Sequence, residues 1–219
     1  MASQSSTRTT SDSSATTSKA EVTPNPRKTL SVLHLGKVDI AELKAAVSRI
    51  PEDVWNLEDA NKPNKFDTLS TTRHIVFRFI RSFYDWRDSY DRPLYAQWKP
   101  LVEPVLAQAT APYGYKRGAF PRVMLARMAP GGVIHPHFDT GPAAQWVHKI
   151  HVPLQTNDGV IFFQENNPHH FAEGEAVEVN NMGYHSVQNR GSTDRIHLIF
   201  EYYDMDQPEP AWAPPRANA

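Results

Sequence analysis

Five short segments rich in β-branched and aromatic residues follow one another between residues 121 and 204, and they constrain the fold more than any other feature. The segments PRVMLARM, HKIHVPLQ, GVIFFQE, EAVEVN and RIHLIFEYY are separated by Gly, Asn, Asp or Pro. Short strands bounded by turn residues are typical of β-sandwiches and β-barrels. The sequence therefore predicts a sandwich or barrel core over residues 121–204.

The preceding residues 28–120 are expected to be mainly helical. A helix is predicted to begin after Asp39 and to end at Pro51, because apolar residues between them share one helix face. A second helix is predicted over residues 94–111, interrupted by two prolines. Helices followed by a run of strands indicate an α+β fold with N-terminal helices.

Both ends of the chain differ in composition from the part between them. Residues 1–27 are dominated by Ser and Thr without apolar periodicity, which predicts a disordered tail. Residues 208–219 form a second, Pro-rich tail, so residues 28–207 are expected to form a single domain. The N-terminal tail lacks the apolar region of a secretory signal, and we expect a cytoplasmic protein.

Composition excludes several classes of function. With 23 basic and 24 acidic residues the net charge is −1, which argues against binding to nucleic acid or to an anionic membrane. No apolar run approaches the roughly 18 residues of a membrane span. The absence of cysteine excludes disulfides, thiolate zinc sites and a cysteine nucleophile. A small-molecule substrate remains the expected partner.

The segment His137-Phe138-Asp139 is a candidate metal site. On an extended segment residues i and i+2 point to the same side, so His137 and Asp139 can converge on one ion. A third ligand can come from His185, which lies in the segment GYHSVQN. Two imidazoles and one carboxylate on one face of a divalent iron are the arrangement of non-haem Fe(II) oxygenases. His135, two residues before His137, allows a His135/His137 pair as a second possibility.

Basic side chains alternate with apolar ones on two of the predicted strands. Arg195 and His197 share one strand face, and Lys149 and His151 share a face of another strand. If the apolar faces pack against a covering layer, these four side chains point into the core, where charges without partners are costly. A bound 2-oxo dicarboxylate would remove that cost, since its distal carboxylate would accept a paired hydrogen bond from Arg195 and its 2-oxo acid end would chelate the iron.

Three further residues are candidates for substrate contacts. Arg127 lies in the strand that enters the metal segment and is a candidate for binding a substrate carboxylate, with a structural ion pair as the alternative. His135 and His197 are the other two candidates.

The stretch from residue 122 to residue 203 resembles the aspartyl/asparaginyl β-hydroxylase family of Fe(II)/2-oxoglutarate oxygenases, whose small bacterial relatives include free-proline hydroxylases. The matching segments are RMAPGGVIHPHFDTGP, HKIHVPL and GYHSVQNRGSTDRIHLIFEYYD. The resemblance implies a double-stranded β-helix, a jelly-roll or cupin-like barrel. It also implies that His137 and His185 bind iron, and that Arg195 binds the distal carboxylate of 2-oxoglutarate.

The resemblance assigns roles to other residues as well. By this resemblance His151 helps to hold the cosubstrate, and Lys149 stands where members of the family carry Arg. Some members use two histidines without an acidic ligand, whereas this chain has Asp139 in a longer loop.

The sequence therefore predicts a dioxygenase that uses Fe(II), 2-oxoglutarate and O2 to hydroxylate an unactivated carbon of a small amino-acid-like substrate. One alternative is a hydroxylase of Asp or Asn in a peptide or protein. A second is a cupin-like metal enzyme that does not use 2-oxoglutarate and has no need of Arg195. A third is a non-enzymatic barrel that binds a small anion.

Overall fold

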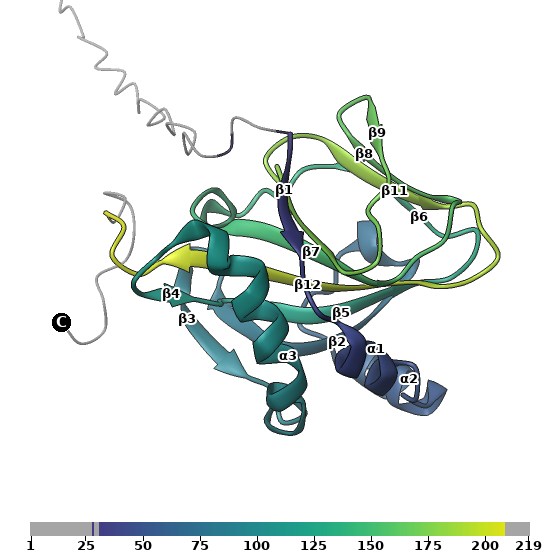
Figure 1. The fold of residues 1–219 in the computed structure, drawn as a ribbon, viewed down its shortest axis with the longest axis horizontal. Helices are drawn as coiled ribbons and strands as arrows, with labels where there is room; N and C mark the ends of the chain where they lie inside the picture. The colour runs from purple at the N-terminus through teal and green to yellow at the C-terminus, as the bar shows by residue number, and fades with distance from the viewer. Residues whose placement is uncertain (1–27, 29–30, 209–219) are drawn as a thin grey trace, which may run out of the picture.

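The computed structural model describes residue 28 and residues 31–208 (Figure 1). The expected tails 1–27 and 208–219 lie, apart from residue 208, outside the described residues. The elements, in chain order, are β1 (Val32–Lys37), α1 (Ala41–Val47), α2 (Glu52–Ala60), η2 (Asp67–Leu69), β2 (Thr72–Ser82), β3 (Asp85–Asp91), α3 (Tyr95–Thr110), η3 (Ala111–Tyr113), β4 (Gly118–Ala119), β5 (Val123–Met128), β6 (Val133–His137), η4 (Pro142–Gln145), β7 (His148–Gln155), β8 (Val160–Gln164), β9 (Asn167–His169), β10 (Glu175–Val179), β11 (His185–Asn189) and β12 (Arg195–Asp204).

The strands form two antiparallel sheets. The larger sheet has the order β1-β10-β7-β12-β5-β2-β3, with β4 against β12, and the smaller has the order β6-β11-β8-β9 (Figure 1). From β5 to β12 the chain passes back and forth between the two sheets, which is the jelly-roll arrangement. The expected double-stranded β-helix is confirmed, as two separate sheets in the described part of the chain rather than a closed ring of strands.

The expectation that residues 28–120 are mainly helical was wrong for four strands. Strands β1, β2 and β3 and the two-residue β4 all belong to the larger sheet, and β2 pairs with both β3 and β5. Ile75 and Phe77 of β2 pack with the helices, while Val76 and Phe79 pack on the opposite face. A strand that is buried on both faces lacks the alternation of polar and apolar residues that reveals a half-buried strand.

The predicted helices form, with corrections at their ends. The Asp39 carboxylate accepts a hydrogen bond of 3.0 Å from the Ala41 amide at the start of α1. Pro51 separates α1 from α2, a helix that was not predicted. Helix α3 runs without interruption through Pro100 and Pro104, contrary to expectation. Both prolines lie on its exposed face, where water can hydrate the carbonyls that lose an amide partner.

The main core lies between the helices and the outer face of the larger sheet. Leu43 of α1, Trp55 of α2 and Leu106 of α3 belong to one buried cluster with Leu198 and Phe200 of β12. These apolar residues of β12 therefore point outward to the covering helices, as predicted. The alternate residues of the same strand point towards the smaller sheet, where the candidate site lies.

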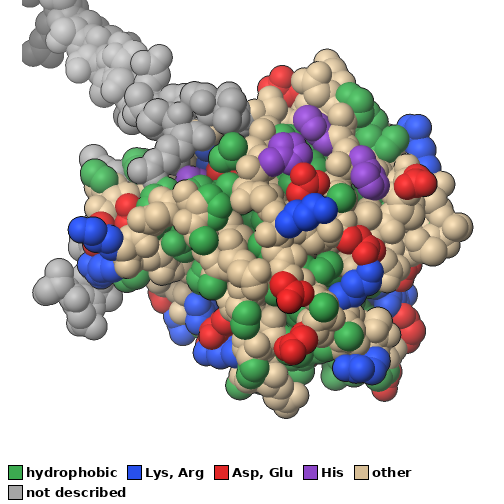
Figure 2. Space-filling view, in the orientation of Figure 1, with side chains coloured by type: hydrophobic (Ala, Val, Ile, Leu, Met, Phe, Trp, Pro, Cys, Tyr) green, Lys and Arg blue, Asp and Glu red, His purple; other side chains and the backbone are tan. Residues whose placement is uncertain are grey.

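The surface in Figure 2 mixes acidic and basic side chains, without a large area of one sign on the described part of this face. No helix in residues 31–208 has the length and apolarity required to cross a membrane.

Candidate active site

A cavity of about 830 Å³ lies between the two sheets and contains most of the predicted site residues. His137, Asp139 and His185 line it together with Lys149, His151 and Arg195.

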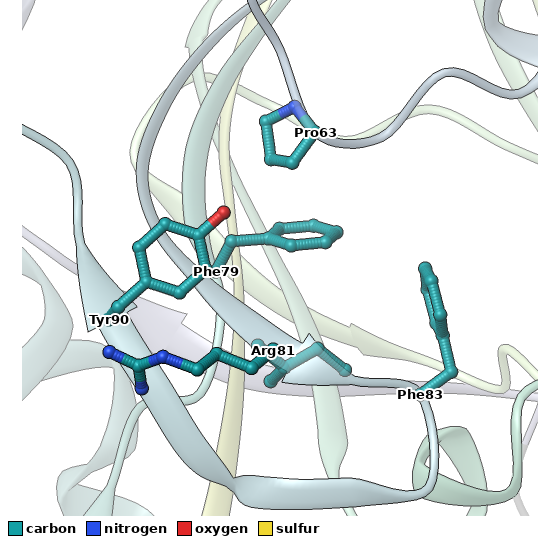
Figure 3. A pocket seen from close by; sticks show the side chains of 6 residues that line it. Pro63, Phe79, Arg81, Phe83 and Tyr90 are labelled. Carbon is teal, nitrogen blue, oxygen red and sulfur yellow. The ribbon is translucent and has the colours of Figure 1, made fainter.

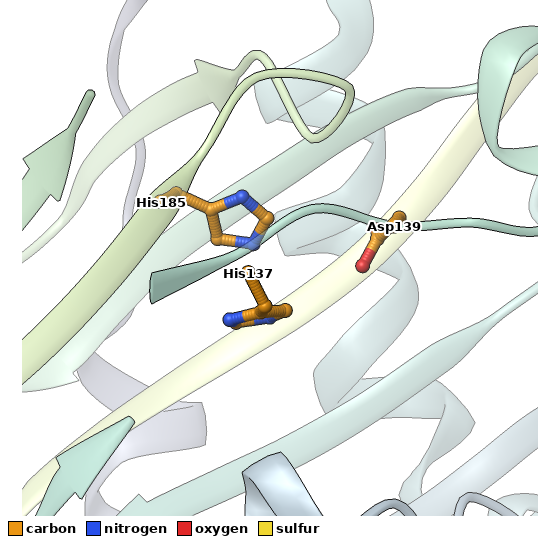
Figure 4. A group of neighbouring side chains, drawn as sticks. All are labelled: His137, Asp139 and His185. Atoms are coloured by element: carbon orange, nitrogen blue, oxygen red, sulfur yellow. The ribbon is translucent and has the colours of Figure 1, made fainter. Parts of the chain in front are cut away.

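The three predicted metal ligands come together in this cavity. In the pairing of β6 with β11, His137 lies directly opposite His185, and their ring centroids are 4.3 Å apart. Asp139 follows β6 and completes the group, in which one potential ligand atom from each residue lies within 4.8 Å of the others (Figure 4). The sequence spacing and the strand register therefore produce one site from two segments.

Both histidines are oriented for metal binding by backbone carbonyls. Nδ1 of His137 lies 2.8 Å from the carbonyl oxygen of His135, and Nδ1 of His185 lies 3.0 Å from that of Gly183. A carbonyl oxygen only accepts hydrogen bonds, so each Nδ1 carries the proton and each Nε2 keeps a free lone pair. This is the usual support of a histidine that binds a metal through Nε2.

The Asp139 carboxylate is held from one side. Lys149 Nζ and Asn181 Nδ2 both donate to its Oδ2, at 3.2 and 3.0 Å, which leaves Oδ1 for a metal. Burial alone would raise the pKa of Asp139, but the charge of Lys149 and the hydrogen bonds from Asn181 and Lys149 hold that pKa well below its usual range. The residue is therefore a carboxylate at neutral pH.

These three side chains fit a divalent first-row metal. Octahedral ligands about 2.1 Å from such an ion lie about 3 Å from one another, so binding would draw the three side chains slightly together. The donor set of two imidazole nitrogens and one carboxylate oxygen suits non-haem Fe(II) and leaves coordination positions open.

His135 is turned away from this group. It is exposed and is not among the residues that line the cavity. The register between β6 and β11 shifts, because Ile134 pairs with Val187 whereas His137 pairs with His185. This bulge breaks the rule that residues i and i+2 share a face. The alternative His135/His137 pair and the substrate role of His135 are therefore not supported by the geometry.

Arg195 lies in the wall of the cavity as an unusually buried cation. Its residue exposure is 2 %, and burial lowers its pKa to about 9. Its Nη2 donates to Nδ1 of His197 at 2.8 Å and lies 3.5 Å from Nδ1 of His151, while Nε has no partner among the described residues. In the part of the chain that the structure describes, no carboxylate pairs with Arg195.

His151 and His197 are neutral neighbours of Arg195. Burial, followed by the Arg195 charge, places the pKa of both histidines well below the ordinary value. Because arginine only donates hydrogen bonds, Nδ1 of His197 must accept. His151 lines the cavity, whereas His197 is not among its lining residues. His197 therefore orients Arg195 and is not placed to touch a substrate.

Lys149 departs from the expectation of four buried basic groups without an acid. Besides Asp139 it approaches Glu201, with 3.9 Å between Nζ and Oε1. Its charge is thus compensated within the chain. We infer that Lys149 positions the carboxylate ligand, in addition to lining the cavity.

Arg127 is a structural residue rather than a cavity residue. Its guanidinium donates two hydrogen bonds, of 2.5 and 2.7 Å, to Glu52 of α2 and lies 4.8 Å from the centroid of the Trp55 ring. It is absent from the cavity lining, while its strand neighbours Met124 and Ala126 line it. The geometry therefore supports a structural ion pair for Arg127 rather than a substrate contact.

Sequence reasoning missed several residues of the cavity and Asn181, which lies behind its wall. Asn181 supports Asp139, Arg122 and Asn64 line the wall, and exposed aromatic side chains surround the opening. The partners of Asn64 and Arg122 are far away in sequence, so no motif indicates them.

Comparison with known proteins bears on the family and the fold of the chain. Residues 103–204 match the family described as "Aspartyl/Asparaginyl beta-hydroxylase". A search of curated proteins found no significant match.

Solved structures share the fold at low sequence identity. The viral collagen prolyl hydroxylase of Paramecium bursaria Chlorella virus-1, in complex with 2-oxoglutarate, has a TM-score of 0.52 at 10% identity and covers 80% of this chain and 96% of its own. AviO1 of Streptomyces viridochromogenes has a TM-score of 0.52 at 13% identity, with coverages of 84% and 93%. The nickel complex of the non-haem monooxygenase ThoJ has a TM-score of 0.50 at 11% identity, with coverages of 81% and 75%.

The resemblance seen in the sequence is thus confirmed: residues 103–204 match the aspartyl/asparaginyl β-hydroxylase family, and the chain shares its fold with solved structures that include a prolyl hydroxylase in complex with 2-oxoglutarate.

Proposed function

We propose that this chain is an Fe(II)- and 2-oxoglutarate-dependent dioxygenase that hydroxylates an unactivated carbon of a small amino-acid-like substrate. One observation carries the proposal. A group of two histidines and one carboxylate shares a single cavity with Arg195, a buried cation that no carboxylate pairs with in the described residues.

We assign His137, Asp139 and His185 as the metal ligands. Bound Fe(II) would supply the redox chemistry by which O2 and 2-oxoglutarate are converted to succinate and CO2 while the substrate gains a hydroxyl group. The chain contributes the orientation of the ligands, through the carbonyls that hold both imidazoles and through the Lys149 and Asn181 bonds to Asp139.

We assign Arg195 as the group that binds the distal carboxylate of 2-oxoglutarate. Its Nε has no partner, so the guanidinium can donate a paired hydrogen bond. Its bond to His197 fixes the plane of the guanidinium, and neutral His151 lies beside it in the cavity wall. A dicarboxylate is the chemistry that satisfies this cation, which argues against a cupin-like enzyme that does not use 2-oxoglutarate.

Two of the solved structures support the ligands by their printed descriptions. The viral prolyl hydroxylase was solved with 2-oxoglutarate, and ThoJ is a non-haem monooxygenase that was solved with nickel. By analogy we propose the same cosubstrate and a first-row metal here.

The proposal is tested by measuring succinate formation from 2-oxoglutarate by the Fe(II)-loaded protein, with a panel of free amino acids and of Asp- and Asn-containing peptides. Hydroxylated product is detected as a mass increase of one oxygen atom. Succinate formed only with metal and O2, and stimulated by a free amino acid, supports the proposal. Stimulation by the peptides alone would instead identify a peptide hydroxylase, and full activity of Arg195→Met without 2-oxoglutarate would refute the cosubstrate.

A further inference from the structure

Aromatic side chains gather at the opening of the cavity. Five residues, each between 40% and 64% exposed, line it: Phe66, Phe83, Tyr84, Phe138 and Tyr184. The remaining large exposed apolar side chains of the described residues are only Leu33 and Leu57. Because exposed apolar surface is costly unless it binds something, this concentration, here called the aromatic mouth, indicates a ligand contact.

The aromatic mouth contains two pairs of rings in contact. Phe66 and Phe83 are in edge-to-face contact, with ring centroids 5.9 Å apart. Phe138 and Tyr184 are in edge-to-face contact at 5.2 Å. Phe138 lies between two of the assigned metal ligands, and Tyr184 directly precedes the third. An apolar group held against Phe138 and Tyr184 would therefore lie near the reacting centre.

Polar atoms without partners lie in the same wall. Asn64 is 3% exposed and lines the cavity, and its Oδ1 has no hydrogen-bond partner among the described residues. Arg122 lies about 5 Å above the rings of Phe79 and Phe83 and donates to Glu201 at 2.6 Å, but its buried Nε also has no partner. Buried donors and acceptors are normally paired. Both side chains line the cavity, so a small rotation of each would turn this acceptor and this donor to the polar head of an amino acid.

The Arg122 end of the cavity is separate from the Arg195 end. Glu201, which holds Arg122, lies six residues beyond Arg195 on β12, which corresponds to about 20 Å along a strand. A molecule of 2-oxoglutarate bound to Arg195 therefore leaves Arg122 available.

The charges around the cavity favour a substrate with a carboxylate. Three cations line it, Arg122, Lys149 and Arg195, with one lining carboxylate, Asp139. Glu201 lies outside the lining but pairs with Arg122 and approaches Lys149. The opposite double charges of Fe(II) and 2-oxoglutarate cancel, so even with Glu201 counted one positive charge remains to bind a carboxylate group.

We propose that the substrate is an amino-acid-like monocarboxylate with an aromatic or similarly flat apolar group. Its polar head binds Arg122 and Asn64, and its apolar group lies in the aromatic mouth. The volume of about 830 Å³ is within the range of pockets that hold drug-sized ligands and accommodates such a molecule beside the cosubstrate. The inference rests on the function proposed for this cavity.

A second hollow, of about 500 Å³, provides a contrast. It shares Phe79 and Phe83 with the cavity and is also lined by Pro63, Arg81 and Tyr90 (Figure 3). There Arg81 donates to Asp88 at 2.6 Å, and none of the residues that line this hollow has a buried polar side-chain atom without a partner. The cavity between the sheets is therefore the better site for an anionic ligand.

The first experiment varies the ligand. Calorimetric titration of the Ni(II)-loaded protein, saturated with 2-oxoglutarate, compares L-phenylalanine with L-alanine, which lacks the ring, and with 2-phenylethylamine, which lacks the carboxylate. We expect L-phenylalanine to bind at least about tenfold more tightly than either, since ring contacts and a paired carboxylate each contribute this much. Equal binding of L-alanine or L-proline, or no binding of L-phenylalanine and L-tryptophan, would overturn the proposal.

The second experiment varies the chain. Phe66→Ala and Tyr84→Ala shorten exposed side chains, and each is expected to weaken L-phenylalanine binding by about 2- to 10-fold. Leu57→Ala is the matched control, since Leu57 is 62% exposed on α2 and outside the cavity. An equal effect of all three substitutions would contradict a binding role of the aromatic mouth.

Binding and turnover separate the two proposals. Phenylalanine binding with the expected ring and carboxylate preference, but without succinate formation, would refute the oxygenase function and leave the inferred ligand class standing. If alanine and proline stimulated succinate formation as strongly as phenylalanine, the oxygenase function would stand and the inferred aromatic substrate class would be refuted.

Discussion

Replacing Arg195 with methionine is expected to have opposite effects on stability and on cosubstrate binding. Methionine keeps most of the side-chain volume but removes the charge and the hydrogen-bond donors. If the buried cation is present for a dicarboxylate, the ligand-free variant should be more stable than the wild-type protein, and 2-oxoglutarate should bind it poorly.

The magnitudes follow from the surroundings of Arg195. Burial lowers its pKa from 12.5 to about 9, and at about 1.4 kcal/mol per pKa unit this corresponds to on the order of 5 kcal/mol that opposes folding. Loss of its hydrogen bond to His197 costs the variant about 1–3 kcal/mol of stability, which offsets part of this gain. We expect a net rise of about 2–4 kcal/mol in the free energy of unfolding without ligand, or about 4–16 °C in Tm.

Removing one partner of a buried charge pair costs about 2–5 kcal/mol, or roughly 30- to several-thousand-fold in affinity. The apparent constant for 2-oxoglutarate should therefore rise at least thirtyfold in Arg195→Met and in Arg195→Ala, and less in Arg195→Lys, which keeps the charge but loses the planar fork. Iron content should stay nearly unchanged in all three.

The assay is thermal unfolding with and without 2-oxoglutarate, combined with succinate formation. In the wild-type protein, ligand at 100 times its Kd should stabilise the fold by about 2.7 kcal/mol, whereas Arg195→Met should not respond at the same concentration. Equal stabilisation of the variant by 2-oxoglutarate would refute the reasoning and would mean that another residue binds the distal carboxylate of 2-oxoglutarate.

Three other predictions concern the rest of the chain. His185→Ala should abolish turnover and strongly reduce iron content, because it removes one of three ligands, and full iron occupancy measured by metal analysis would contradict the assignment. His151 and His197 have pKa values in the folded protein well below the value of about 6.5 for the unfolded chain. Below that pH the unfolded state binds more protons, so the free energy of unfolding should fall in acid by up to about 1.4 kcal/mol per pH unit and per histidine. Urea titrations at pH 7.5 and 5.5 should show a smaller fall for His197→Gln than for the wild-type protein. Arg127→Ala should lower Tm slightly, because its contacts with α2 are lost, but leave the apparent constant for 2-oxoglutarate unchanged. A large rise in that constant would show that Arg127 contacts a ligand.

Much of the site could be predicted because its pattern is local. The positions of His137 and Asp139 in an extended segment, and the alternation of Arg195 and His197 with apolar residues, follow from the period of two of a β-strand. The same period predicted the β-rich half of the chain, and turn residues marked where its strands end. The resemblance to a known family supplied the pairing with His185, which lies 46 residues after Asp139.

The rest depended on contacts between distant segments. Arg127 has the sequence context of a ligand residue, but it donates to Glu52 of helix α2, which lies 75 positions away in sequence. Lys149 has the pattern of a free cation, but the fold places it beside Asp139 and Glu201. Packing decides which charges pair. The periodicity of side chains along one strand predicts the face on which a charge lies but not its partner.

The sequence by itself determined which residues can bind a metal and a dicarboxylate, because those chemistries require particular side chains at short spacing. Only the tertiary structure decided which way they face and what surrounds them. The bulge in β6 turns His135 outward, and strand β2, buried on both faces, extends the larger sheet. The aromatic mouth joins side chains from segments more than 100 residues apart. Its members have no common motif, because a cavity is formed by surfaces that meet only when the sheets pack.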